Sequence, residues 1–335
     1  MAADRRSADP LHARAIAPAL AVLVALAMLG GCGDDGAGDA SQADAAGAAA
    51  DPGFQSANAL WRLQRVEALS AADGWASLIG LYPIELRAHY VGSDASSGLR
   101  LAHGPPKLGL LQQDGGRLYF TPERGVVVTR DGEPLPRGRV ELRDDRDPAP
   151  TVLGFDDGKG RFTVIERNGR RALRAWHADA ESRLQFGRLD YWPADPGWQL
   201  TGRFEPHPAG QRLEIVDILG HLRPMANPGA VVFERDGASH RLEALDGGDG
   251  ALFLMFADRT SGHDSYGAGR YLYTAPVAAD GSVVLDFNRA INPPCAFTDF
   301  ATCPLPPASN RLDVAITAGE KRYARHTTPA PKPQG

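Results

Sequence analysis

The sequence predicts a mainly β protein with one helix near its N-terminus. Short apolar runs, cut by Gly, Pro, Asp and Asn, fill most of the chain, which is typical of antiparallel β folds. Asp-Gly pairs between these runs predict tight hairpin turns. Residues 57–72 differ, because they contain no Gly or Pro and carry apolar residues at helical spacing, namely Leu60, Leu63, Val66 and Leu69.

The first 31 residues predict a secretory signal. Three arginines precede an apolar run at 15–29, which is short for a bilayer span. The run ends in Leu-Gly-Gly followed by Cys32, which resembles the lipobox of bacterial lipoproteins. Cys32 is therefore the expected lipidation site, the membrane an expected partner, and the cell envelope the expected location, with the protein facing the periplasm or the exterior. An ordinary cleaved signal and an uncleaved anchor helix are the alternatives.

Composition divides the remaining chain. Residues 33–53 are almost wholly Gly, Ala, Asp, Ser and Gln and cannot bury a core, which predicts a flexible tether. The expected organisation is a signal peptide at 1–31, the tether at 32–53, a helix and β-sandwich at 54–171, an aromatic bridge at 172–198, a C-terminal β domain at 199–325 and a disordered tail at 326–335.

Charge argues against nucleic acid as a partner. The whole chain has a formal charge of −5, and the signal carries three basic and two acidic side chains, so the mature chain has −6. No basic stripe of the kind that binds a phosphate backbone is present.

The first β region has the outline of a meander. Strands are expected at 118–121, 126–129, 139–142, 151–155 and 161–166. This outline resembles a forkhead-associated sandwich, although an unrelated sandwich is an equal alternative. The arginine that holds phosphothreonine in that family is missing from Val91-Gly92-Ser93, so phosphopeptide binding is not predicted.

The second β region follows an aromatic bridge. Its tryptophans and tyrosine are expected to seal one layer against another, with a sugar-stacking platform as the alternative. Strands are expected at 199–205, 212–218, 230–235, 239–244, 252–257, 269–274, 282–285 and 313–317. The run at 252–256 is apolar on both faces, which predicts a central strand.

Two polar segments at 258–273 and 285–321 carry the candidate site. The candidate acids or bases are Asp258, Asp286 and Glu320, and the candidate ligand-binding residues are Arg270, Thr260, Asn288, Asn292 and Asn310. The planar guanidinium of Arg270 can bind a carboxylate or phosphate bidentately. Convergence of these groups predicts a polar pocket for a small anionic or amide-bearing ligand. The alternative is a structural network that satisfies irregular backbone around the prolines.

The same segments resemble the signature of domain-of-unknown-function family 1684. The matching stretches are 258–260, 266–270, 286–288, 292–295, 303–307, 310–312 and 318–321. Ile291 departs from the aromatic residue that is common there. The resemblance extends to the N-terminal helix but implies no settled reaction.

Two cysteines remain if Cys32 is lipidated. In an oxidising compartment, Cys295 and Cys303 are expected to form a disulfide, which the loop-entropy model values at roughly 2.5 kcal/mol. Two free thiols, or a catalytic or metal role, are the alternatives. The spacing is not that of a zinc site, and neither a metal nor a cofactor is predicted.

Three functions remain open at this stage. The first is a membrane-tethered protein that binds a small ligand in the C-terminal pocket. The second is a hydrolase that uses Asp258 or Asp286 as base and Arg270 as electrostatic stabiliser. The third is a structural envelope protein, which requires that the polar segments be buried with their polar atoms paired internally.

Overall fold

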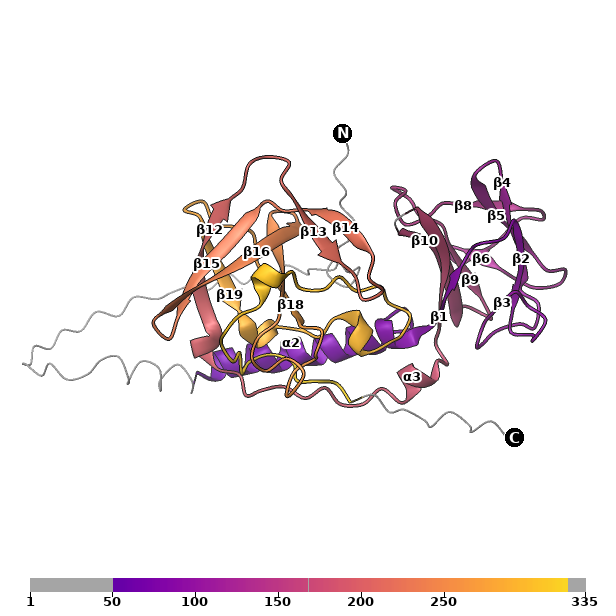
Figure 1. Cartoon of the computed structure of the whole chain (residues 1–335). Helices are drawn as coiled ribbons and strands as arrows, with labels where there is room; N and C mark the ends of the chain where they lie inside the picture. Colours follow the sequence, from indigo (N-terminus) through magenta and orange to yellow (C-terminus); the bar gives the residue numbers. More distant parts are fainter. Residues whose placement is uncertain (1–50, 168, 325–335) are drawn as a thin grey trace, which may run out of the picture.

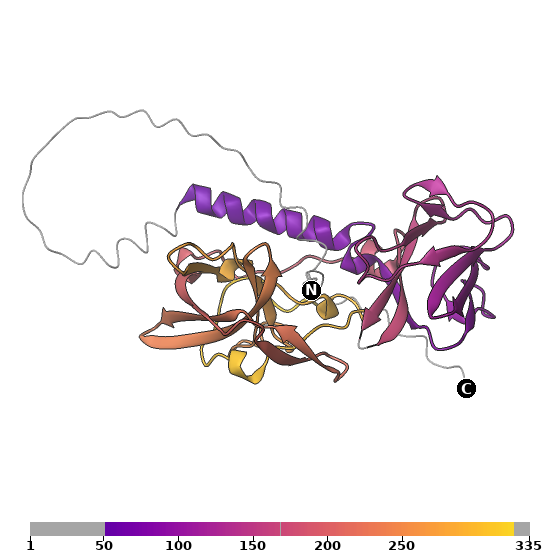
Figure 2. The same ribbon diagram turned by 90° about the horizontal axis from the view of Figure 1, so that it is seen from above.

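The computed structural model describes residues 51–167 and 169–324 (Figure 1). Two β-rich lobes lie at opposite ends of the molecule, and the helix α2 (Pro52–Ser70) runs along the C-terminal lobe toward the N-terminal one (Figures 1 and 2). The mainly β fold and the N-terminal helix are confirmed. The expected signal, the lipidation site Cys32, the tether up to residue 50 and the tail expected at 326–335 lie outside the described residues.

Helix α2 turns a different face to the protein than the leucine spacing suggests. Its buried residues are Asn58, Arg65 and Leu69, whereas Leu60 and Leu63 are 57% and 69% exposed. An α-helix turns by about 100° per residue, so steps of three drift around the axis and Leu60 lies opposite Leu69. The spacing predicted a helix correctly, but it did not predict the buried face. That face contains Arg65, which binds polar groups of the C-terminal lobe.

The N-terminal lobe is a sandwich of two sheets around one core. One sheet has the order β1-β11-β10-β9-β6-β7 and the other β3-β2-β4-β5-β8. Phe120 from one sheet and Phe155 and Phe162 from the other are fully buried in this core. The strands are β1 (Leu78–Pro83), β2 (Ala88–Gly92), β3 (Leu99–Arg100), β4 (Gly109–Asp114), β5 (Arg117–Pro122), β6 (Thr129–Arg130), β7 (Glu133–Pro134), β8 (Val140–Leu142), β9 (Val152–Phe155), β10 (Gly160–Arg167) and β11 (Arg170–His177).

Strand β11 crosses the boundary expected at residue 171. It pairs with β10 on one side and β1 on the other, so it is an inner strand of the sheet. The sequence assigned most of it to the aromatic bridge at 172–198 because Trp176 lies close to the other aromatic residues of that segment. Arg174 is buried, with its guanidinium 5.4 Å from the ring centre of Trp75. The likeness to a forkhead-associated domain stays a prediction.

The C-terminal lobe is built on a six-stranded antiparallel sheet that curls into a half-barrel. Its order is β18-β17-β16-β15-β12-β19, and a separate hairpin pairs β13 with β14. The strands are β12 (Gln199–Pro206), β13 (Arg212–Val216), β14 (Leu222–Ala226), β15 (Gly229–Arg235), β16 (Ala238–Gly248), β17 (Ala251–Phe256), β18 (Arg270–Tyr273) and β19 (Ser282–Asp286). The apolar run at 252–256 is an inner strand, as expected.

Short helical turns complete the chain. α3 (Glu181–Leu184) and η3 (Pro196–Trp198) lie between the lobes in sequence, and η2 (Trp75–Ser77) follows α2. The proline-rich C-terminal segment contains η4 (Phe287–Arg289), η5 (Pro294–Ala296) and η6 (Ala308–Asn310). None of the described helices is long and apolar enough to span a membrane.

The strand expected at 313–317 does not form. Ile316 is fully buried, but its N–H donates to the Asp258 carboxylate at 3.0 Å and its carbonyl accepts from Arg270 at 2.9 Å. Two charged side chains therefore satisfy backbone groups that a neighbouring strand would otherwise pair. The apolar character of the segment predicted its burial but not its conformation.

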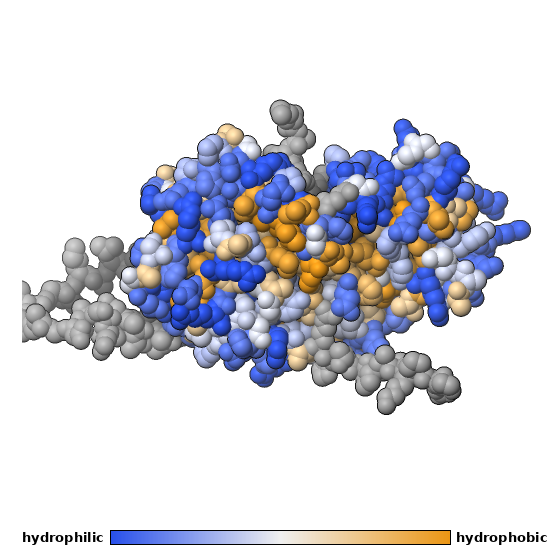
Figure 3. Space-filling model, viewed as in Figure 1, coloured by the Kyte–Doolittle hydropathy of each residue, from blue (hydrophilic) through white to orange (hydrophobic). Residues whose placement is uncertain are grey.

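An apolar patch covers the β13–β14 hairpin (Figure 3). Its side chains are 39–61% exposed and comprise Val216, Ile218, Leu219 and Leu222. The segment that carries Cys295 and Cys303, called the disulfide segment below, holds the hairpin from one side. Ile218 N–H donates to the Cys303 carbonyl at 2.9 Å, and Leu305 N–H donates to the Val216 carbonyl at 2.8 Å.

Candidate functional site: a buried charge network

The first part of the network is an ion pair between Asp258 and Arg270. Arg270 begins β18, and its Nη2 donates to Asp258 Oδ2 at 2.8 Å. The same guanidinium donates to the carbonyls of Ile316 and Ala318. Both side chains have no solvent exposure. Nη2 therefore donates two hydrogen bonds and Nη1 donates one, all to protein atoms.

The loop after β17 holds the Asp258 carboxylate in place. Its Oδ1 accepts from the N–H of Thr260 at 3.0 Å and from the Thr260 hydroxyl at 2.7 Å. Thr260 also hydrogen-bonds Ser265 at 2.8 Å. Gly269 precedes Arg270 with φ +89°, and a Cβ there would lie 2.5 Å from the Phe256 carbonyl oxygen, so this turn requires glycine.

The second part joins α2 to the C-terminal segment. Arg65 Nε donates to Glu320 Oε1 at 2.9 Å, and Arg65 Nη2 donates to the Asn292 carbonyl at 3.2 Å. The other oxygen of Glu320 accepts from Asn292 N–H at 2.6 Å. Glu320 is fully buried, and the side chain of Arg65 is 7% exposed. One carboxylate therefore binds two elements that are far apart in sequence.

The two ion pairs adjoin each other. Tyr271 and Ile291 form an antiparallel bridge, which places their neighbours Arg270 and Asn292 opposite one another. The Arg270 guanidinium lies 5.0 Å from the ring centre of Trp192. Burial lowers the pKa of Arg270, while the charges of Asp258 and Glu320 act in the opposite direction. Arginine is a very weak acid, and the carboxylates of Asp258 and Glu320 favour its charged form, so we treat Arg270 as a cation.

Tyr191 borders the second ion pair. Its hydroxyl lies 3.5 Å from Glu320 Oε1, and the guanidinium of Arg62 lies 4.6 Å from its ring centre. Burial raises the pKa of Tyr191, and the Glu320 carboxylate raises it further. The phenol is therefore neutral and can donate its proton to the Glu320 carboxylate.

Two candidate asparagines have other partners. Asn288 pairs with the backbone of Asp195 through both its amide groups, at 2.9 Å each. Asn310 accepts from Glu243 N–H at 2.7 Å and donates to the carbonyls of Glu243 and Met255. Each amide thus imitates a neighbouring backbone strand and holds a loop to the sheet.

The structure brings Asp258, Thr260, Arg270, Asn292 and Glu320 together, but not into an open pocket. All five are at most 8% exposed. Asp286 caps η4 by accepting from Asn288 N–H at 3.1 Å and faces Arg289 at 3.3 Å, so it takes no part in the network. The hydrolase hypothesis needs Asp258 within reach of Arg270, which is found, but a substrate would also need access to both. Ligand binding by these residues stays a prediction.

Sequence reasoning missed Arg65, Tyr191 and Trp192. A usable signal was present for Arg65, because residues 58, 65 and 69 share one helical face and a cation on a buried face requires a partner. No local pattern indicates Tyr191 and Trp192, whose positions depend on how the segment after β11 crosses the C-terminal lobe.

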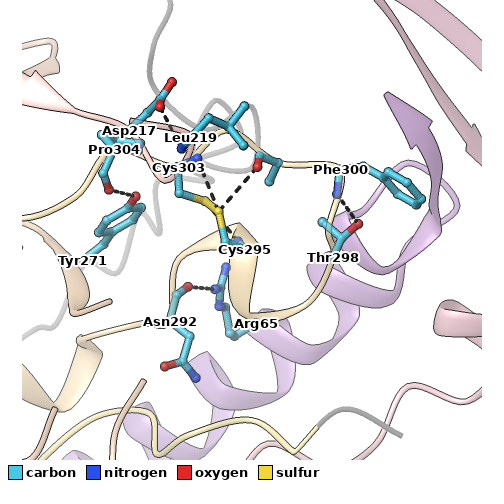
Figure 4. The surroundings of a disulfide bond; sticks show 11 residues. Arg65, Asp217, Leu219, Tyr271, Asn292, Cys295, Thr298, Phe300, Cys303 and Pro304 are labelled. Atoms are coloured by element: carbon cyan, nitrogen blue, oxygen red, sulfur yellow. Dashed lines mark hydrogen bonds between the residues drawn. A yellow bond between two sulfur atoms is a disulfide. The ribbon is translucent and has the colours of Figure 1, made fainter. Parts of the chain in front are cut away.

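The disulfide between Cys295 and Cys303 is present, as predicted, and lies beside α2 (Figure 4). Their Cα atoms are 6.1 Å apart, and the two residues are 5% and 4% exposed. Burial and the bond itself argue for a structural role over a metal or catalytic one, and no metal-ligand group of three or more is found among the described residues.

Removing the disulfide is expected to cost about 2.5 kcal/mol of stability, because the bond closes a short loop. The double variant Cys295→Ala/Cys303→Ala should show this loss in urea unfolding. It should also raise amide exchange at Ile218 and Leu305, whose hydrogen bonds tie the β13–β14 hairpin to the disulfide segment. Unchanged exchange at these two amides would contradict the proposed support of the hairpin.

Glu243 supplies a pH dependence. Burial would raise its pKa, but hydrogen bonds from His207 and Asn227 and the charge of Arg241 bring the net pKa below the ordinary 4.5. A folded-state pKa below the unfolded one adds stability above about pH 4.5, and this is lost as pH falls through the folded value. Between about pH 5 and pH 3, the His207→Gln variant should lose less stability than the wild type. An equal loss would show that Glu243 is not responsible.

Taken together, fold and site define a two-lobed, mainly β protein whose C-terminal lobe is closed by buried ion pairs. The family model described as "Protein of unknown function (DUF1684)" matches residues 184–321, and the chain belongs to this family. This confirms the resemblance of the C-terminal motifs, whereas the N-terminal helix, to which the resemblance was also extended, lies outside the matched range. The matched range contains both carboxylates of the network.

The chain is also similar to solved structures, of which five chains match. An uncharacterized protein of Haloarcula marismortui, determined by solution NMR, is 33% identical and covers 42% of this chain and 78% of its own, with a TM-score of 0.35. No curated protein matches the chain.

Proposed function

We propose that the protein is a lipid-anchored structural protein of the cell envelope. In this proposal α2 and the DUF1684 lobe form a rigid base next to the tether, and the base carries the N-terminal lobe. The polar residues of the DUF1684 lobe then serve to hold this base together and do not contact a ligand.

Trp75 carries the proposal. It stands at the first turn of the N-terminal lobe, yet it packs on the disulfide cluster of the C-terminal lobe, which comprises Cys295, Ala301 and Cys303. Two hydrogen bonds reinforce the junction: Arg183 Nε donates to the Ser70 carbonyl at 2.8 Å, and the Ser182 hydroxyl donates to the Ala76 carbonyl at 2.7 Å. Such contacts favour a fixed arrangement of the lobes over free movement.

The anchor is tested by growing cells on a labelled fatty acid. The wild-type chain should take up the label and sediment with membranes, whereas Cys32→Ser should do neither. The control Ser41→Ala should behave as the wild type. An unlabelled, freely released wild-type protein would overturn the anchor.

Rigidity is tested by pulsed electron paramagnetic resonance. Spin labels at positions 137 and 188, placed on Cys32→Ser to avoid a third site, report the distance between the lobes. A single narrow distance peak is expected. A distribution spread over tens of ångströms would contradict the rigid base, whatever the result of the fatty-acid experiment.

A second candidate keeps the ligand site in the C-terminal lobe. Among the described residues, Arg270 Nε and Asn292 Oδ1 are buried without a hydrogen-bond partner, one a donor and the other an acceptor. Unpaired buried polar atoms are costly, and a small polar guest between them would remove that cost. Full burial limits such a guest to a molecule of about water size. Thermal stabilisation by a larger metabolite, lost in Asn292→Leu, would contradict this limit.

A further inference from the structure

We propose that the N-terminal lobe binds a small multivalent oxyanion, such as a pyrophosphate or phosphate-ester group, in a groove lined by four arginines. This proposal goes beyond the anchoring role and does not depend on it. The groove has a volume of about 500 Å³. It is lined from β5, from β8 with the loop after it, and from β11, and its arginines are Arg117, Arg143, Arg146 and Arg171.

Two of these arginines are held only weakly. Arg117 faces Glu141 at 3.6 Å, and Arg143 faces Asp147 at 3.5 Å. Their side chains are 66% and 50% exposed. Exposed ion pairs at such distances contribute at most about 1 kcal/mol, so exchanging the protein carboxylate for a ligand oxygen costs little. Both guanidinium groups can therefore turn toward an anion in the groove.

The other two arginines are more firmly positioned. Arg171 donates to the Gly116 carbonyl at 2.8 Å and is 30% exposed. Arg146 is itself 60% exposed, but it makes two ion pairs, one with Glu166, whose side chain is only 7% exposed, and one with Asp144 at 3.4 Å. These two would supply a preorganised part of the site, while Arg117 and Arg143 close over the ligand.

The composition of the groove selects the ligand class. Four guanidinium groups meet three lining carboxylates, Glu141, Asp144 and Asp147, and a fourth carboxylate outside the lining, Glu166, pairs with Arg146, so the charges at the groove are nearly balanced. A singly charged ion gains little over the carboxylates already present. A ligand with two or more clustered charges can engage several planar guanidinium groups at once, and bidentate geometry suits phosphate oxygens.

The test is calorimetric titration of the full mature chain with pyrophosphate, with chloride as the reference anion at equal ionic strength. Saturable binding at about millimolar concentration or tighter is expected. The double variant Arg117→Gln/Arg143→Gln should weaken it about tenfold or more, because two charged contacts are lost. Raising the salt from about 0.05 M to about 0.5 M should weaken it as well, since screening reaches exposed charges.

The matched control is Arg188→Gln/Arg259→Gln, which removes two exposed, ion-paired arginines outside the groove. It should bind pyrophosphate as the wild type does. Vesicles containing phosphatidylglycerol form a separate arm: binding to them that is lost in the groove variant places the phosphate on a lipid headgroup, while binding to pyrophosphate alone indicates a free ligand. Absence of saturable binding in both arms, or equal weakening in the control, would overturn the proposal.

Discussion

Replacing Glu320 by alanine is expected to destabilise the C-terminal lobe by about 3–5 kcal/mol. Glu320 forms a buried ion pair with Arg65 at 2.9 Å. Its removal takes the carboxylate at 2.9 Å away from a buried guanidinium and leaves the N–H of Asn292 without its acceptor. Urea unfolding followed by tryptophan fluorescence measures the loss, since Trp61 and Trp192 flank the network.

The double variant Arg65→Met/Glu320→Leu separates charge pairing from simple packing. The double variant has no Arg65 guanidinium to bury without the Glu320 carboxylate. It should therefore be more stable than Glu320→Ala alone. The exposed pair Arg188–Asp190 is the control, and its double replacement should change stability by less than about 1 kcal/mol. A double variant as unstable as the sum of its single changes would show that Arg65 and Glu320 act independently.

The Asp258→Asn substitution should cost about 3–5 kcal/mol while keeping the shape of the side chain. Arg270 would then lack its buried counter-charge, and the N–H of Ile316 would lose its charged acceptor. In the wild type these side chains pair with the backbone of Ile316 as a neighbouring strand would. In the variant, the rate of amide hydrogen exchange at Ile316 should therefore rise more than the rate at core amides of the N-terminal lobe. Hydrogen exchange followed by mass spectrometry or NMR provides the measurement.

Asp313→Asn is the matched control for this substitution. Asp313 also pairs with an arginine, Arg259, at 2.7 Å, but the two side chains are 87% and 62% exposed. Its replacement should leave both stability and the exchange of Ile316 nearly unchanged. If both asparagine variants behaved alike, burial of the Asp258–Arg270 pair would have no energetic consequence.

The arginines of the groove and those of the buried network differ in exposure and in how closely they are paired. In the network, Arg65 and Arg270 are buried, and their guanidinium groups are occupied by carboxylates and backbone carbonyls. In the groove, Arg117 and Arg143 are exposed and loosely paired. Residue type alone does not distinguish these roles. Side-chain exposure and the distance to the partner carboxylate distinguish the two roles. For this reason we propose that an anion from solution binds in the groove and not in the buried network.

Local sequence determined the secondary structure where the physical cause is itself local. Most of the helix follows from a run at 57–70 without Gly or Pro, whereas its start at Pro52, inside the expected tether, was not predicted. The Asp131-Gly132 and Asp236-Gly237 turns have the positive φ values that such hairpins need. Cys295 and Cys303 lie close in sequence within one rigid segment, so their pairing was also predictable.

Tertiary structure alone decided which faces are buried and what the polar residues do. Leu60 and Leu63 are exposed while Arg65 is buried, because Glu320 and the Asn292 carbonyl, more than 220 residues away, provide its partners. The segment around Ile316 is not a strand, because Asp258 and Arg270 meet its backbone groups. Burial of a charge is permitted only by a partner brought from elsewhere in the chain, and no local pattern contains that information.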